Sequence, residues 1–246
     1  MSNKKNVIVI GATSGIGLST ALKLKDIGHN VVIIGRNKEK LKNLEYKYGI
    51  MGYKIDLANT REIASKISEL LKNLSRIDCF INCAGIGLFG NLINLTDEEI
   101  IECCNINFTG TILLEKYVAK LMIDQHSGHI ITIESLASDN GICNGEIYSA
   151  TKAGISMFNS ILEKKLRLSN IKVTSIKPGL VNTKLIDLLQ IDEKKKLYGL
   201  QTEDVTRAII FAMDQPDNAT ISEIKVRPFD KKGQSQFQEM INLKYS

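Results

Sequence analysis

The feature that most constrains the fold is a regular alternation of short, β-rich apolar runs with longer helical stretches along the 246 residues. Continuous apolar runs are typical of parallel strands that are buried on both faces. The predicted strands span residues 6–10, 31–34, 51–55, 79–82, 129–133, 172–176 and 223–226. The predicted helices between them span residues 16–27, 38–48, 60–74, 97–122, 147–168 and 203–213. This order predicts an α/β fold with a parallel sheet covered by helices on both faces.

Apolar residues make up 43% of the chain and charged residues 24%, which is typical of a globular protein. No linker or low-complexity segment divides the sequence, so we predict a single domain over residues 1–246. Residues 86–95 and 182–200 have the weakest pattern and are predicted to form loops or small helices over the edge of the sheet. The first apolar run is too short for a signal segment or a membrane span, so we expect a cytoplasmic protein without a membrane partner.

The charge and the cysteines exclude several classes of function. The formal net charge is +5, and basic residues alternate with acidic ones, so no nucleic-acid partner is expected. The five cysteines are an odd number, lie in apolar surroundings and share no ligand spacing with the three histidines. We therefore expect buried, reduced thiols and no metal site.

The turn after the first predicted strand carries three glycines in the spacing G-x-x-x-G-x-G. Glycines there let the backbone turn tightly and approach a ligand, and the following helix N-terminus offers N–H groups to a pyrophosphate. An ordinary strand-to-helix turn is the alternative interpretation. The residues predicted to contact a dinucleotide at this turn are Gly11, Thr13, Ser14, Gly15, Ile16 and Gly17.

The second predicted strand ends at Gly35 and Arg36, with no Asp or Glu to hold the ribose 2′-hydroxyl of NAD(H). A guanidinium suits the 2′-phosphate of NADP(H). Lys38, Lys40 and Lys42 follow and add positive potential, although an ordinary solvated helix face has the same pattern. The sequence therefore favours NADP(H), with NAD(H) as the alternative.

Tyr148 and Lys152 are four residues apart and so share one face of a predicted helix. Ser135 follows a predicted central strand and precedes Tyr148 by thirteen residues, which places it where open α/β sheets bind ligands. In the reduction of a ketone, Tyr148 would donate the proton and Ser135 would hydrogen-bond the substrate oxygen. To exchange protons near neutral pH, Tyr148 would need its pKa lowered from about 10 by roughly 2–3 units, and the charges of Lys152 and of an oxidised nicotinamide both favour that lowering.

Together these motifs resemble the short-chain dehydrogenase/reductase family, over residues 6–228. The resemblance implies a Rossmann-like, doubly wound sheet of seven parallel strands in the order 3-2-1-4-5-6-7. It also implies that Lys152 binds the ribose of the nicotinamide half, and that Asn107 holds a water next to Lys152. Asn105 is the neighbouring alternative for that asparagine. Ile10 departs from the family's usual threonine before the first glycine.

Three further segments resemble the family's cofactor-binding motifs. Asn82-Cys83-Ala84-Gly85 resembles a segment that passes close to the adenosine and ribose, with Cys83 in place of an asparagine. Asp56-Leu57 matches an adenine-contacting position, and a helix N-cap is the alternative role for Asp56. The segment after the sixth strand resembles a clamp for the nicotinamide carboxamide. The cofactor-binding residues implied by these segments are Asp56, Leu57, Asn82, Ala84, Gly85, Pro178, Gly179, Val181 and Thr183.

The predicted function is that of an NAD(P)-dependent oxidoreductase, specifically an NADPH-dependent carbonyl or 3-oxoacyl-type reductase. The alternatives are a dinucleotide-binding regulatory protein without turnover and a sugar-nucleotide epimerase or dehydratase. The substrate pocket is assigned to residues 86–95, 136–147 and 185–200, where apolar side chains such as Leu88, Phe89, Ile142, Leu188 and Leu189 favour a medium-sized apolar carbonyl compound.

Two expectations concern the surroundings of the site. The helices predicted at 97–122 and 147–168 are apolar on more than one face, and the resemblance implies that they pair between subunits of a homodimer or homotetramer. Glu134 stands before Ser135, where relatives carry a small residue. The sequence leaves two roles open for Glu134, since its side chain either tunes the site or faces away from it.

Overall fold

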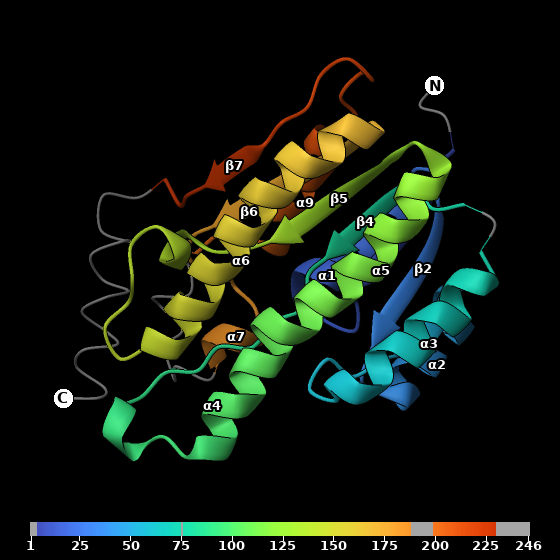
Figure 1. Cartoon of the computed structure of the whole chain (residues 1–246). Helices are drawn as coiled ribbons and strands as arrows, with labels where there is room; N and C mark the ends of the chain where they lie inside the picture. The colour runs from blue at the N-terminus through green and yellow to red at the C-terminus, as the bar shows by residue number, and fades with distance from the viewer. Residues whose placement is uncertain (1–3, 75, 188–198, 230–246) are drawn as a thin grey trace.

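Strand β1 (Asn6–Ile10) lies in the interior of a seven-stranded parallel sheet, and its side chains alternate between the two faces. Val7 and Val9 belong to the core on one face, and Ile8 and Ile10 to the core on the other. A computed structural model describes residues 4–74, 76–187 and 199–229 of the chain (Figure 1). Burial on both faces explains why this run is continuously apolar.

The strands follow the order β3-β2-β1-β4-β5-β6-β7, and every pair is parallel. This confirms the predicted sheet and its order. The strand order reverses between β1 and β4, and a doubly wound sheet opens a crevice there at the carboxyl ends of its strands. The other strands are β2 (Asn30–Gly35), β3 (Met51–Lys54), β4 (Cys79–Asn82), β5 (Gly128–Ile133), β6 (Ile171–Pro178) and β7 (Glu223–Val226).

Helices cover both faces of the sheet, as predicted. One face packs against α1 (Gly15–Asp26), α2 (Lys38–Tyr48) and α9 (Thr202–Met213). The other face packs against α3 (Thr60–Lys72), α5 (Gly110–Gln125) and α6 (Glu146–Leu166), which lie in front of the sheet in Figure 1. Among the described residues, no helix is long and apolar enough to cross a membrane.

The helix predicted at 97–122 is interrupted by a wider turn. It consists of α4 (Asp97–Cys104), a π-helical segment (Asn105–Thr109) and α5. Helix α4 begins with a capping box, because the Thr96 side chain accepts from Glu99 N–H and the Glu99 carboxylate accepts from Thr96 N–H. A Cβ on Gly110 would lie 2.6 Å from the carbonyl oxygen of Leu57, so glycine lets the π-helical segment approach the end of β3. Single π turns of this kind are frequent at functional sites.

The expectation that all strands are buried on both faces is wrong for β3 and β7. Both are edge strands, and their residues are exposed or half-buried; Met51 is 50% exposed. An edge strand has only one neighbour and receives less cover from the helices. The two weakly patterned segments contain a 3₁₀ turn (Leu92–Asn94) and the short helix α7 (Lys184–Asp187), while residues 188–198 lie outside the described part.

Candidate active site

A cavity of about 710 Å³ opens at the carboxyl ends of the central strands, around the point where the strand order reverses. Predicted site residues from distant parts of the chain line it together. They are Gly11, Thr13, Ser14, Gly15, Ile16, Gly17, Arg36, Asp56, Leu57, Ala84, Gly85, Ser135, Tyr148, Lys152, Pro178, Gly179, Val181 and Thr183. Asn82 and Asn107 are the predicted site residues that do not line it.

The glycine turn is shaped for a close ligand. Gly11 has a φ of +76°, and a Cβ there would lie 2.8 Å from the backbone of Cys83 and Ala84. A Cβ on Gly17 would lie 2.5 Å from the carbonyl oxygen of Gly11, so only glycine lets α1 begin this close to the turn. The side chain of Ser14, the N-cap of α1, makes no capping hydrogen bond, so the helix N-terminus directs N–H groups into the cavity. These residues fit the pyrophosphate of a dinucleotide.

Arg36 and Asp56 lie at the end of the cavity formed by β2 and β3. The Arg36 guanidinium is 61% exposed and forms an ion pair of 3.4 Å with Glu102 of α4. The Asp56 carboxylate accepts from Ala58 N–H at 3.0 Å, and the N-cap of α3 is Asn59. The alternative in which Asp56 caps the helix is therefore wrong, because the cap lies three residues later.

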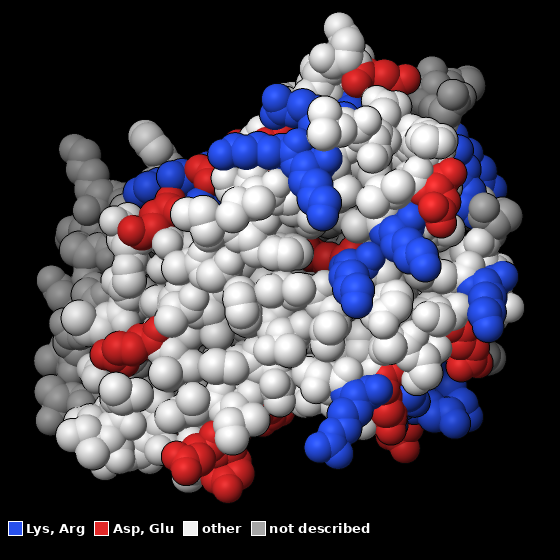
Figure 2. Space-filling view, in the orientation of Figure 1, with Lys and Arg blue, Asp and Glu red and all other residues white. Residues whose placement is uncertain are grey.

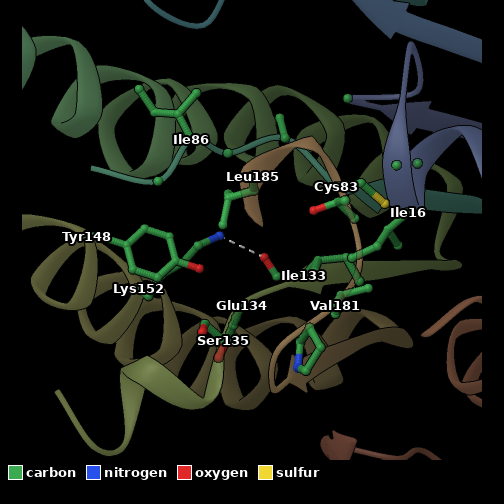
Figure 3. A pocket seen from close by; sticks show the side chains of 18 of the residues that line it. Ile16, Cys83, Ile86, Ile133, Glu134, Ser135, Tyr148, Lys152, Val181 and Leu185 are labelled. Atoms are coloured by element: carbon green, nitrogen blue, oxygen red, sulfur yellow. Dashed lines mark hydrogen bonds between the residues drawn. The ribbon is translucent and has the colours of Figure 1, made fainter. Parts of the chain in front are cut away.

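Ser135, Tyr148 and Lys152 converge from β5 and α6, as Figure 3 shows. The Ser135 hydroxyl lies close enough to the Tyr148 phenol to lower its pKa. Lys152 Nζ lies 5.9 Å from the centre of the Tyr148 ring and donates to the carbonyl oxygen of Ile133 at 3.1 Å. The Ser135 hydroxyl also accepts from Ala137 N–H at 3.1 Å, which fixes its direction at the strand end. A phenol, a hydroxyl and an ammonium thus face one space.

Burial dominates the electrostatics of this group. Burial raises the pKa of Tyr148, and the nearby Ser135 hydroxyl only partly opposes that effect. Burial also lowers the pKa of Lys152, against the charge of Glu134, which raises it. In the chain without a cofactor, desolvation of the phenolate outweighs the other contributions, and the lowering expected from Lys152 together with an oxidised nicotinamide stays a prediction.

Asn82 and Asn107 are buried behind the cavity wall. Asn82 Oδ1 accepts from Ala84 N–H at 3.1 Å, and its amide donates to Glu115 at 3.3 Å. Asn107 pairs with the backbone of Ile86 through both its amide oxygen (2.8 Å) and its amide nitrogen (2.9 Å). Both asparagines therefore fix the path of the segment after β4, while the cofactor contact expected of Asn82 and the water expected at Asn107 stay predictions.

The wall near Tyr148 is largely apolar. The Phe89 ring packs against Tyr148 with centroids 5.4 Å apart, and Ile142 lines the same region, whereas Leu88 is not among the lining residues. Leu188 and Leu189 lie outside the described residues. Sequence reasoning missed Lys184 and Arg227, which line the rim; only their position after the predicted sixth and seventh strands could have indicated them.

The cysteines are only partly as predicted. Cys79 and Cys103 are buried and Cys83 and Cys104 are half-buried, but Cys143 is exposed, because it lies in the loop between Ser135 and Tyr148. Burial raises the pKa of both the Cys79 and the Cys83 thiol to about 12, so these two are not nucleophiles near neutral pH. Within the described part of the chain, no group of three or more His, Cys, Asp or Glu side chains is arranged to hold a metal ion.

Comparison with known proteins supports the same interpretation. An uncharacterised oxidoreductase of Staphylococcus aureus is 34% identical over 227 residues, which is 91% of this chain and 97% of that protein. The solved structure of ElxO with NADP bound superimposes with a TM-score of 0.82 at 25% identity, over 95% of this chain and 100% of the other. A metagenomic short-chain oxidoreductase in complex with NADP gives a TM-score of 0.78 at 29% identity, over 92% and 98%.

The family model for short chain dehydrogenases matches residues 5–194. This match covers the glycine turn, the strand that leads to Ser135 and the helix that carries Tyr148 and Lys152. The resemblance inferred from the motifs is confirmed, and the chain belongs to the short-chain dehydrogenase family of oxidoreductases.

Proposed function

We propose that the protein transfers a hydride between C4 of a bound NADP(H) nicotinamide and a carbonyl or alcohol substrate. The observation that carries this proposal is the convergence of Ser135, Tyr148 and Lys152 in the cavity that also contains the glycine turn. A general acid, an oxygen-binding hydroxyl and a dinucleotide cradle are the parts that carbonyl reduction requires of a protein. The roles of individual residues below belong to this proposal.

The chain's own residues would handle the proton and the substrate oxygen. Ser135 donates a hydrogen bond to that oxygen and stabilises its developing charge. Tyr148 delivers the proton in reduction and removes it in oxidation. Lys152 lies beside the phenol and is within reach of a ribose. A bound nicotinamide supplies or accepts the hydride and, when oxidised, adds the positive charge that favours phenolate.

The preference for NADP(H) rests on the end of β2. Arg36 lines the cavity there, and its guanidinium can form bidentate hydrogen bonds with a 2′-phosphate once its ion pair with Glu102 is broken. No acidic residue lies at the adjacent positions 35 and 37. Two of the similar solved structures, ElxO and the metagenomic oxidoreductase, were determined with NADP. NAD(H) remains the alternative cofactor.

For the substrate we propose a medium-sized apolar carbonyl compound, of which 3-oxoacyl thioesters are one class. Phe89, Leu136, Ile142 and Leu185 line the cavity together with Tyr148. Apolar walls with a few fixed polar groups are typical of sites that bind such molecules. The basic rim residue Lys184 suits a substrate with an acidic carrier.

The test is a panel of carbonyl compounds assayed with NADPH and NADH in parallel. We expect NADPH to be oxidised with an apolar ketone or a 3-oxoacyl thioester, and Tyr148→Phe to lower kcat by about 10²–10⁴-fold because the acid is lost. Tyr148→Phe should still bind NADPH, and Tyr46→Phe, at an exposed position on α2, serves as the control. Full activity of Tyr148→Phe would exclude the mechanism. Cofactor binding without turnover across the panel would favour the regulatory alternative.

The assembly and location also stay proposals. We propose a homodimer or homotetramer in which α4, α5 and α6 meet the same helices of a second subunit. The cytoplasmic location and the single domain over residues 1–246 remain predictions from the sequence.

A further inference from the structure

Glu134 is a buried carboxylate directly behind the proposed catalytic serine. The residue is 2% exposed, and its side chain is fully buried. One carboxylate oxygen, Oε1, accepts from the Ser175 hydroxyl of β6 and from the Asn159 amide of α6, the latter at 3.1 Å. The carboxylate therefore connects the end of β5, which carries Ser135, with the helix that carries Tyr148 and Lys152.

Glu134 forms an ion pair with Lys177, but the charge of Lys177 is already neutralised by other carboxylates. Lys177 Nζ lies 3.9 Å from Glu134 Oε2, but 2.7 Å from Asp139 and 2.6 Å from Glu223. Lys225 contacts the same two carboxylates. Among the described residues, Glu134 Oε2 has no hydrogen-bond partner. Lys177 thus has two closer counter-ions, and much of the charge of Glu134 is left to act on other groups.

Lys152 is the other buried lysine on which the charge of Glu134 acts. Its Nζ donates to the carbonyl oxygen of Ile133, the residue before Glu134. Lys152 and Glu134 both line the cavity (Figure 3). Asn159, which binds Glu134, lies two helical turns after Lys152 on the same face of α6. Burial lowers the pKa of Lys152, and among the groups that raise it Glu134 has the largest effect, ahead of Cys103 and Cys83.

The carboxylates around this pair come from three elements. Glu134 acts from β5, Asp139 from the loop after Ser135, and Glu115 from α5, where the charge of Glu134 helps to raise the pKa of Glu115. Glu115 accepts from Thr132 at 2.8 Å and from Asn82, so its own partners lie on β5 and β4. Of these carboxylates, Glu134 is the one whose charge raises the pKa of Lys152.

We propose that Glu134 is a positioning residue, which keeps Lys152 protonated in its buried place and fastens β5 to α6 so that Ser135 and Tyr148 face one substrate atom. The role rests on the proposed oxidoreductase function, in which the charge of Lys152 supports the phenolate of Tyr148. The carboxylate beside Ser135 thus acts on the site through Lys152, without contacting the substrate.

The test compares Glu134→Gln with Asn159→Ala. The first variant removes the charge and keeps an acceptor for Ser175 and Asn159, whereas the second keeps the charge and removes a hydrogen bond. The titration of Lys152 is followed by NMR of lysine-labelled protein, with the signal assigned by its loss in Lys152→Met, and the pH profile of kcat/KM is measured in parallel.

We expect Glu134→Gln to lower the titration midpoint of Lys152 by about one pH unit, the low end of the effect of a nearby opposite charge. The alkaline limb of kcat/KM should move down with it, while Asn159→Ala lowers thermal stability and leaves the midpoint in place. An unchanged Lys152 midpoint in Glu134→Gln overturns the proposal. Because the NMR titration needs no turnover, it stands apart from the carbonyl panel, on which the oxidoreductase function depends.

If Glu134→Gln does not fold, the double variant Glu134→Gln/Lys152→Met decides the question by thermal denaturation. Removing both charges restores folding if the two side chains are coupled. A double variant that is as unstable as the single one overturns the electrostatic role of Glu134.

Discussion

In the proposed function, the selectivity of the cavity for NADP(H) over NAD(H) depends on Arg36. Arg36 follows the end of β2 and forms an ion pair with Glu102. The Arg36 side chain is 61% exposed and the Glu102 side chain 48%. Exposed ion pairs contribute little, about 0–1 kcal/mol, so Glu102 is a weak competitor for a phosphate. The 2′-phosphate of NADPH would therefore displace Glu102 at small cost.

Replacing Arg36 with alanine is expected to lower the ratio of kcat/KM for NADPH over NADH by about tenfold or more. The physical reason is the loss of hydrogen bonds between charged groups, each of which contributes about 1.5–3 kcal/mol. The measurement is steady-state kinetics with both cofactors. Lys42→Ala, at an exposed position on the neighbouring helix α2, is the matched control and should leave the ratio unchanged. A wild type that uses both cofactors equally would contradict the NADP(H) preference.

At the scale of single elements, α5 carries a buried carboxyl group whose ionised form is disfavoured by desolvation. Glu115 is fully buried against β4 and β5, accepts from Thr132 and Asn82, and has one oxygen without a partner among the described residues. Desolvation raises the pKa of Glu115 from 4.5 to about 7. The folded state therefore binds its proton more tightly than the unfolded state does.

The sign of the resulting pH dependence follows from linkage. Below pH 4.5 both states hold the proton, whereas between the two pKa values the unfolded state has lost it and the folded state has not, so stability falls as pH rises. At pH 8, Glu115→Gln should increase the free energy of unfolding by up to about 3 kcal/mol, and at pH 4 by much less. Thermal or urea denaturation of the wild type and of Glu115→Gln at both pH values measures this difference in the free energy of unfolding.

Asp124→Asn is the control for the Glu115 prediction. It removes a carboxylate from an exposed position of the same helix α5 and should change stability little at either pH. Equal stabilisation of Glu115→Gln at pH 4 and pH 8 would mean that the carboxyl is not the group responsible.

At the scale of the whole molecule, the outer face of α4 and α6 exposes apolar side chains. Ile101, Met157 and Ile161 are 58%, 63% and 58% exposed. Figure 2 shows a broad area of uncharged atoms in the middle of the face formed by α4, α5 and α6. Exposed apolar patches of this kind are typical of protein–protein interfaces. They support the proposed pairing of these helices between subunits.

The double variant Met157→Glu/Ile161→Glu is expected to convert the oligomer to a smaller species. Burying two carboxylates in an interface carries a large desolvation cost. Light scattering coupled to size-exclusion chromatography measures the mass. Phe211→Glu is the control, because Phe211 is 59% exposed on α9, which covers the opposite face of the sheet. A wild type that is monomeric would refute the proposed assembly.

The sequence by itself determined the architecture and most of the cavity lining. Strand and helix periods depend on local alternation, so β1, β4 and β7 begin and end at the predicted residues. The glycine turn and the Tyr148–Lys152 spacing are also local, since a turn needs Gly11 and one helical turn aligns residues four apart. Such features are determined by neighbours along the chain.

Only the tertiary structure decided the features that depend on burial and on contacts between distant segments. The pKa of Tyr148 is raised because surrounding elements exclude water, and Asn82 turns toward Glu115 because α5 lies against β4. The role of Glu134 likewise required the packing of β6 and α6 around its carboxylate. Desolvation and long-range partners exist only once the chain has folded, and for that reason local sequence patterns could not predict them.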